Sequence, residues 1–224
     1  MNMEGADKLL QRTGKYGWIY PDSIHFNEAR DLHNEFWKHK VSRVKIWTGM
    51  KDNKLVINGI QFYYKKQDQK DEFSLGEHVG QTNLKDTFEI KLEQNEYLTD
   101  FHIRIDQEVT QIGFTTNKKD KQVFGGETGE DKIINLKEKD AVIFAPYGCY
   151  KDNLQSCGVY WYNRKEYAKK YFAGYFELRY LVQKKQGFKE AAEKLKLDES
   201  NKVLLKVCSL PPPQFNAIIR FCLN

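Results

Sequence analysis

The residues that could carry out chemistry are few, and their spacing does not favour catalysis. The chain has five histidines: His25, His33, His39, His78 and His102. None stands at the i, i+4 spacing of a helical metal pair or beside a pair of cysteines, so metal binding is not indicated. A nucleophile with a neighbouring base is not recognisable either. These residue types therefore predict no enzyme and no metal site.

One glycine-rich segment is faintly similar to a phosphate-binding loop. Residues 124–129 read Phe-Gly-Gly-Glu-Thr-Gly. A P-loop ends in Lys-Ser/Thr and opens a helix, and neither feature follows here. We therefore interpret the segment as a glycine-rich hairpin turn between two strands.

The cysteines indicate a reducing environment. They are Cys149, Cys157, Cys208 and Cys222, without a C-x-x-C pair, and the chain has no Asn-x-Ser/Thr acceptor for a glycan. A chain of 224 residues can bury a core without disulfide staples. We expect four free thiols and an intracellular protein.

The elements that would position any site are mostly strands. Between residues 41 and 161 apolar side chains recur at period two, in short runs separated by charged or glycine-containing breaks. Val44, Ile46 and Thr48 form one such row, and Ile60 and Phe62 belong to another. Strands that keep one side polar predict antiparallel sheets in a sandwich, barrel or prism. The fold class is therefore mainly β.

The periodicity becomes helical near the C-terminus. Tyr167, Tyr171 and Tyr175 stand four apart, and Asn163 with Glu166 has the spacing of a capping box. Beyond a stiff joint of three prolines comes a second amphipathic set, Phe215, Ile218, Ile219 and Cys222. We predict a small α-helical extension over residues 162–224, and also a short helix within residues 27–39.

Charge and composition exclude several classes of protein. The 36 Lys and Arg residues and the 31 Asp and Glu residues give a net charge of +5, and 40% of the residues are hydrophobic. Because basic residues are scattered among acidic ones, nucleic-acid binding is not indicated. The apolar content argues against intrinsic disorder, and no apolar run approaches the roughly 20 residues that span a bilayer.

Several segments, in their order along the chain, resemble the jacalin-related lectin family. They are residues 56–64 (VINGIQFYY) after the Thr48-Gly49 turn, 88–92 (FEIKL) with 96–98 (EYL), 111–117 (QIGFTTN), 124–129 (FGGETG), and 141–144 (AVIF) leading to 154–161 (LQSCGVYW). Asn58-Gly59 alone would predict a type I′ hairpin turn, whereas the resemblance places it inside a strand. The similarity covers roughly residues 14–161, after an N-terminal tail of residues 1–13.

This resemblance implies a fold and a binding site. The fold is a β-prism of three four-stranded Greek-key sheets, which binds sugar at one end without a cofactor or catalysis. In the family, the sugar is held by an early glycine-rich loop and a final Gly-x-x-x-Asp loop. The corresponding residues here are Gly14, Gly17 and Trp18 in the early loop, and Lys151, Asp152, Asn153 and Gln155 in the final loop.

Both key positions of the final loop differ from the family's pattern. Lys151 stands where the glycine is expected and Gln155 where the aspartate is expected. An amide offers a neutral acceptor, which forms weaker hydrogen bonds to hydroxyls than an ionised carboxylate does. Trp18 also stands where a further glycine is expected, although Asp152 could enter the site by a register slip. We therefore expect weak or no carbohydrate binding.

Two hypotheses about function follow. The first is a non-enzymatic structural or interaction subunit of a larger intracellular assembly. Its partner-binding residues would be Tyr167, Tyr171, Tyr175, Phe215, Ile218 and Ile219. The basic pI would suit an acidic scaffold such as a microtubule or equally a mitochondrial assembly, and we favour the cytoskeletal location slightly. The second hypothesis is a lectin that binds mannose- or galactose-type sugars.

Overall fold

The computed structural model describes residues 10–32, 39–66, 71–80, 84–136 and 140–166. Ala6–Asn163 form one compact unit, and Met1–Gly5 with Arg164–Asn224 form a second. Residues 164–166 are the described part of the second unit, and they are helical. The rest of the predicted helical extension, with all six predicted partner-binding residues, lies outside the described residues.

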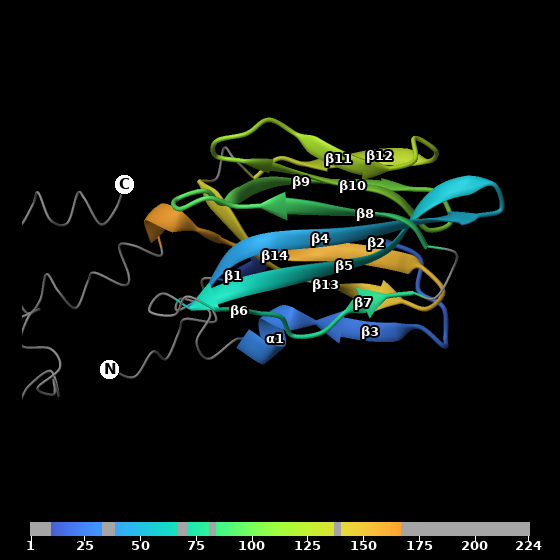
Figure 1. The fold of residues 1–224 in the computed structure, drawn as a ribbon, viewed down its shortest axis with the longest axis horizontal. Coiled ribbons are helices and arrows are strands. Elements are labelled where there is room, and N and C mark those ends of the chain that lie inside the picture. Colours follow the sequence, from blue (N-terminus) through green and yellow to red (C-terminus); the bar gives the residue numbers. More distant parts are fainter. Residues whose placement is uncertain (1–9, 33–38, 67–70, 81–83, 137–139, 167–224) are drawn as a thin grey trace, which may run out of the picture. The chain divides into compact units, whose positions relative to one another are not determined.

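Three antiparallel sheets make up the first unit (Figure 1). The first sheet has the order β1 (Leu10–Arg12), β14 (Leu154–Asn163), β13 (Ala141–Tyr150), β3 (Ile24–Asn27), and β2 (Tyr16–Gly17) also pairs with β14. The second has the order β11 (Gln122–Gly125), β10 (Val109–Thr116), β9 (Leu98–Ile105), β12 (Glu130–Ile134). The third has the order β6 (Glu72–Phe73), β5 (Lys54–Lys66), β4 (His39–Lys51), β8 (Leu84–Lys91), and β7 (His78–Val79) also pairs with β5. One short helix, α1 (Glu28–Leu32), follows β3.

Each sheet is built on a central hairpin, formed by β13–β14, β9–β10 or β4–β5. An outer strand returns beside the first strand of the hairpin, as β12 does beside β9 and β8 beside β4. This is the Greek-key arrangement that the resemblance implied. The predicted β-prism is therefore confirmed, with the difference that the two-residue strands β2 and β7 give two of the sheets a fifth strand.

The core lies between the sheets, where the period-two rows meet. The predicted rows on β4 and β5 are buried, as are Phe101 and Ile103 on β9 and Ile112 and Phe114 on β10. The Phe62 ring meets the Phe114 ring of the neighbouring sheet edge-on, with centroids 5.8 Å apart. Burial of one such large apolar side chain contributes roughly 1.5–3 kcal/mol. The apolar residues that recur at period two in the sequence therefore form the interior of the prism.

Residues 124–129 do not form the hairpin turn that we predicted. β11 pairs with β10, and β12 pairs with β9, so the segment crosses between two outer strands. Gly125 and Gly129 have φ angles of 110° and 96°. A Cβ on Gly125 would lie 2.2 Å from the Thr110 carbonyl oxygen, so the glycines permit close backbone approach. In contrast, Asn58 and Gly59 lie within β5, as the resemblance implied.

The turns of the three central hairpins gather at one end of the prism, which we call the tip end (Figure 1). The Lys51 ammonium and the Asn153 side-chain amide both donate to the buried Glu108 carboxylate, which joins the three turns. Lys54 at the start of β5 also pairs with Asp106, at an N–O distance of 2.7 Å. We call the opposite end, where β4 and β13 begin and β5 and β14 end, the base.

Candidate functional site

The two loops predicted to form the site lie side by side at the tip end. Tyr16 and Gly17 of β2 pair with Cys157 and Ser156 of β14. Trp18 donates its backbone N–H to the Gln155 carbonyl at 3.2 Å. β2 thus holds the early loop against the final loop.

Gly17 is required for this approach. Its φ angle is 114°, and a Cβ on it would lie 2.1 Å from the Gln155 carbonyl oxygen. Gly14 is less constrained, because a Cβ there would first meet the Tyr16 ring, at 3.2 Å. The two predicted glycines therefore differ in role, since only Gly17 needs a conformation that side chains rarely adopt.

Lys151 is paired with a residue that sequence reasoning missed. Its ammonium donates to the Asp22 carboxylate, from the loop between β2 and β3. This hydrogen bond raises the pKa of Lys151 and lowers the pKa of Asp22. Both side chains are exposed, so the pair adds little stability, although it neutralises the charge at this position.

Gln155 is also engaged from within the protein. Its side chain is 5% exposed, and its amide oxygen accepts a hydrogen bond from the Ser23 hydroxyl at 2.5 Å. Asp22 and Ser23 therefore bind both of the positions that depart from the family pattern. A ligand hydroxyl that donates to the Gln155 amide oxygen must displace Ser23 or use the remaining lone pair of that oxygen.

Asn153 and Asp152 have opposite environments. Asn153 is fully buried and donates to Glu108, so its side chain cannot contact a ligand in solvent. This position is a correction to our candidate list, and its cause is the central place of the residue among the hairpin turns. Asp152 is exposed, and its backbone passes so close to Gly80 that a Cβ there would lie 2.1 Å from the Asp152 carbonyl oxygen.

An exposed apolar loop borders these residues. Trp18 is 64% exposed, and Ile19, Tyr20 and Ile24 are exposed as well. The loop is ordered by two hydrogen bonds between Tyr20 and Ser23, at 3.0 and 3.1 Å. Sequence reasoning named Trp18 alone, although the unalternated run Trp-Ile-Tyr-Pro at residues 18–21 is a signal that could have revealed the rest.

A buried polar cluster lies at the start of α1. The Glu28 carboxylate, which is 1% exposed, accepts hydrogen bonds from the Tyr64 hydroxyl and from His78 Nε2, the latter at 2.9 Å. The His78 ring also stacks on Phe26, with centroids 4.1 Å apart. Burial raises the pKa of Glu28, and the two hydrogen bonds oppose this shift. The cluster ties α1 to β5 and β7.

Other site types receive no support from the described residues. Within them, no group of three or more His, Cys, Asp or Glu side chains could hold a metal ion. The helical segments of the described ranges include none that is long and apolar enough to cross a membrane. Cys149 and Cys157 are buried free thiols, whereas Cys208 and Cys222 lie outside the described residues.

Comparison with solved structures reveals the same fold in plant lectins. A mannose-binding jacalin-related lectin from Ananas comosus matches with a TM-score of 0.53 and 18% identity, over 69% of this chain and 98% of that one. The agglutinin of Calystegia sepium matches with a TM-score of 0.52 and 20% identity, over 68% of this chain and 96% of that one. A Malaysian banana lectin has the same TM-score at 16% identity, over 68% of this chain and 98% of that one.

No curated protein is similar enough to the chain to count as a match. The family model for the jacalin-like lectin domain matches residues 29–160, which is more than half of the chain. This range contains the central hairpins of all three sheets and the final loop of the candidate site. The chain therefore belongs to the jacalin-like lectin domain family.

Proposed function

We propose that the protein is a non-enzymatic interaction subunit of a larger intracellular assembly, built on a jacalin-like lectin domain. The observation that carries this proposal is the internal pairing of Gln155 with Ser23 and of Lys151 with Asp22. The two positions that would grip sugar hydroxyls are thus engaged by the protein's own loop. The buried free thiols Cys149 and Cys157 suit a reducing compartment.

Energetics support weak sugar binding at this site. A hydroxyl of a sugar would replace the Ser23 hydroxyl at Gln155, so one neutral hydrogen bond is exchanged for another. Such an exchange adds little free energy, since the net contribution of one neutral hydrogen bond is about 1 kcal/mol. A carboxylate would offer stronger, charge-assisted bonds.

The apolar loop of Trp18, Ile19, Tyr20 and Ile24 supports a protein as the partner at the tip end. Aromatic residues are enriched in the energetically dominant part of protein interfaces. The loop is held by hydrogen bonds, so little entropy is lost when a partner binds. The mutual pairing of Asp22 with Lys151 leaves little net charge beside it, which favours an apolar partner surface.

Affinity capture with the full chain tests this proposal. The substitutions Trp18→Ala and Ile19→Ser together should remove specific proteins from the captured set. The matched control is Val123→Ser with Ile133→Ser, which removes two exposed apolar side chains from the outer strands β11 and β12. Identical protein sets from the two variants would contradict an interaction surface at the tip end.

The C-terminal extension is tested in the same way. In our proposal its apolar set, which includes Phe215 and Ile218, contributes to partner binding. The full chain with Phe215→Ser and Ile218→Ser should lose captured proteins that the wild type retains. Retention of every protein by this variant would restrict the interaction to the prism.

A lectin that binds mannose- or galactose-type sugars is the second candidate function. It is favoured by the close approach of β2 to β14 and by the exposure of the Trp18 and Tyr20 rings and of Asp152. A glycan array probed with the wild type and with Trp18→Ala tests it. Binding that depends on Trp18 would favour the lectin, and a blank array for both proteins would contradict it.

A further inference from the structure

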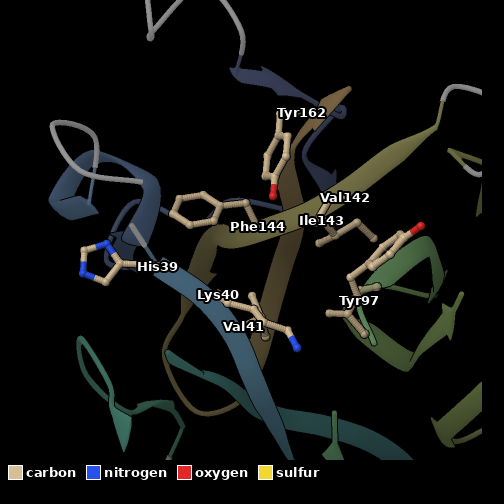
Figure 2. A pocket seen from close by; sticks show the side chains of 9 residues that line it. His39, Lys40, Val41, Tyr97, Val142, Ile143, Phe144 and Tyr162 are labelled. Atoms are coloured by element: carbon tan, nitrogen blue, oxygen red, sulfur yellow. The ribbon is translucent and has the colours of Figure 1, made fainter. Parts of the chain in front are cut away.

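The base of the prism carries a partly buried lysine, Lys40, which has no carboxylate within ion-pair distance among the described residues. A shallow hollow there has a floor of Val41, Ile143 and Phe144, and the side chains of Lys40, Tyr97 and Tyr162 stand around it (Figure 2). Its volume of about 20 Å³ holds one water molecule. The hollow is therefore too small to enclose a small-molecule ligand, and only its rim can make contacts.

Lys40 is the charged group of this rim. Its ammonium donates to the backbone carbonyl of Glu93 at 2.8 Å. The carboxylates of the surrounding turns are engaged by other cations. Lys118 pairs with Glu93 at 3.1 Å, and Lys119 pairs with Glu96 at 3.0 Å.

The Glu72 carboxylate, opposite Lys65 of β5, is engaged as well. Arg43 pairs with Glu72 at 3.1 Å, and Lys65 lies 3.8 Å from the same carboxylate. Across the described ranges, therefore, Lys40 has no carboxylate within 4.0 Å. Among the described residues of the base, the ammonium of Lys40 is therefore not matched by a carboxylate.

The direction of the pKa shift of Lys40 agrees with the absence of a paired carboxylate among the described residues. Its partial burial lowers its pKa, and the nearby ammonium groups of Lys118 and Lys65 lower it further. The Glu96 carboxylate acts in the opposite direction and does not restore the ordinary value. A carboxylate placed against Lys40 would relieve this repulsion and recover the attraction that burial strengthens.

We propose that the base of the prism binds an acidic peptide segment of a partner protein, with a carboxylate at Lys40 and further acidic residues near Lys65 and Lys118. Lys40 and Lys65 are cross-strand partners on β4 and β5, and Lys118 lies in the turn after β10, so the three lysines come from two of the sheets. The Tyr97 and Tyr162 rings, which line the same hollow as Lys40, provide apolar contact beside the proposed ion pair between Lys40 and a peptide carboxylate. This inference rests on the proposed function, since it names the chemistry of one partner of the interaction subunit.

A fluorescently labelled peptide of ten glutamates is a suitable probe, with the full chain and fluorescence anisotropy as the readout. The wild type should bind the peptide, and Lys40→Gln should weaken binding about tenfold, the loss expected for one charge-assisted contact. Lys85→Gln on β8 is the matched control, because it removes the same charge from an exposed position on a strand of the same sheet. Its affinity should stay within about twofold of the wild type, as expected for an isolated exposed charge.

A second variant and a second ligand keep the test decisive. Lys118 lies on an exposed turn, so the substitution Lys118→Gln should leave the fold intact. It should weaken peptide binding, which keeps the proposal testable if Lys40→Gln unfolds the chain. Inorganic phosphate and sodium chloride are added at the same ionic strength as competitors of the labelled peptide. Phosphate should displace the peptide no better than chloride does, because the hollow is too small to enclose a phosphate ion. Equal losses for Lys40→Gln and Lys85→Gln, or specific competition by phosphate, would overturn the inference. A wild type that ignores the peptide yet still captures its partners would overturn this inference alone and leave the proposed function standing.

Discussion

Glu28 is a carboxylate in a place where an ionised group is costly. It is buried, and its two hydrogen-bond donors are Tyr64 on β5 and His78 on β7. Removal of the carboxylate leaves two buried polar groups without their partner, which costs about 3 kcal/mol. We predict that Glu28→Ala loses about this much free energy of unfolding, measured by urea denaturation, whereas the isosteric Glu28→Gln loses much less. An equal loss for both variants would show that the side-chain volume matters and the hydrogen bonds do not.

The same residue predicts a dependence on pH. Because burial raises the pKa of Glu28 above its usual value of 4.5, the folded state takes up a proton that the unfolded state has already released. The contribution of Glu28 to stability is therefore complete below about pH 4.5 and is lost as the pH rises through the folded pKa. Each unit of difference between the pKa values of the folded and unfolded states changes the free energy of unfolding by about 1.4 kcal/mol.

The check is urea unfolding of the wild type and Glu28→Gln at pH 4.5 and pH 7.5. The advantage of the wild type over the variant should be larger at the lower pH. The same comparison in a His78→Gln background separates the effect of the carboxylate from that of its histidine partner. An advantage that grows with pH in both backgrounds would contradict a raised pKa.

The identity of the site residues was more predictable than their partners. The resemblance located Lys151 and Gln155, and the structure places them beside the early loop. Their partners Asp22 and Ser23 stand about 130 residues earlier in the chain, so no local pattern connects the two segments. Asn153 was misjudged for the same reason, because its burial depends on turns from all three sheets.

At the scale of elements, β2 depends on one glycine. Alanine at position 17 would place a Cβ against the Gln155 carbonyl oxygen and force an unfavourable φ angle. We predict that Gly17→Ala costs about 2 kcal/mol and increases hydrogen exchange at the Trp18 amide, which donates across this pair of strands. Gly14→Ala is the control and should change exchange little, since its Cβ meets a ring that can move. Similar exchange in the two variants would refute the role given to Gly17.

The strands were predictable because their pattern follows from burial of one face. The apolar rows predicted on β4, β5, β9 and β10 are buried, although polar neighbours such as Gln61 and His102 are buried as well. Turn chemistry was less reliable, since the glycines of residues 124–129 serve a crossing between outer strands. The glycine signal is the same for a hairpin turn and for close backbone approach, and only strand pairing distinguishes them.

At the scale of the whole molecule, the prism separates two kinds of surface. The tip end presents an apolar loop beside internally paired polar residues, and the base presents Lys40, which pairs with no carboxylate in the described ranges. The family resemblance predicted the prism, which the structure confirms, and implied a sugar site at one end, which stays a prediction. It could not predict the isolation of Lys40, because this depends on which cations pair with Glu93, Glu96 and Glu72.

The central claim is that the sugar end is occupied by the protein's own side chains. Calorimetric titration of the wild type with methyl mannoside and methyl galactoside tests it most directly, beside the double variant Lys151→Gly and Gln155→Asp. The wild type should bind neither sugar, with any dissociation constant above about 10 mM, whereas the variant should bind one of them in the millimolar range because a carboxylate replaces the amide. A wild-type dissociation constant of about 1 mM or lower, weakened by Gln155→Ala, would contradict the claim.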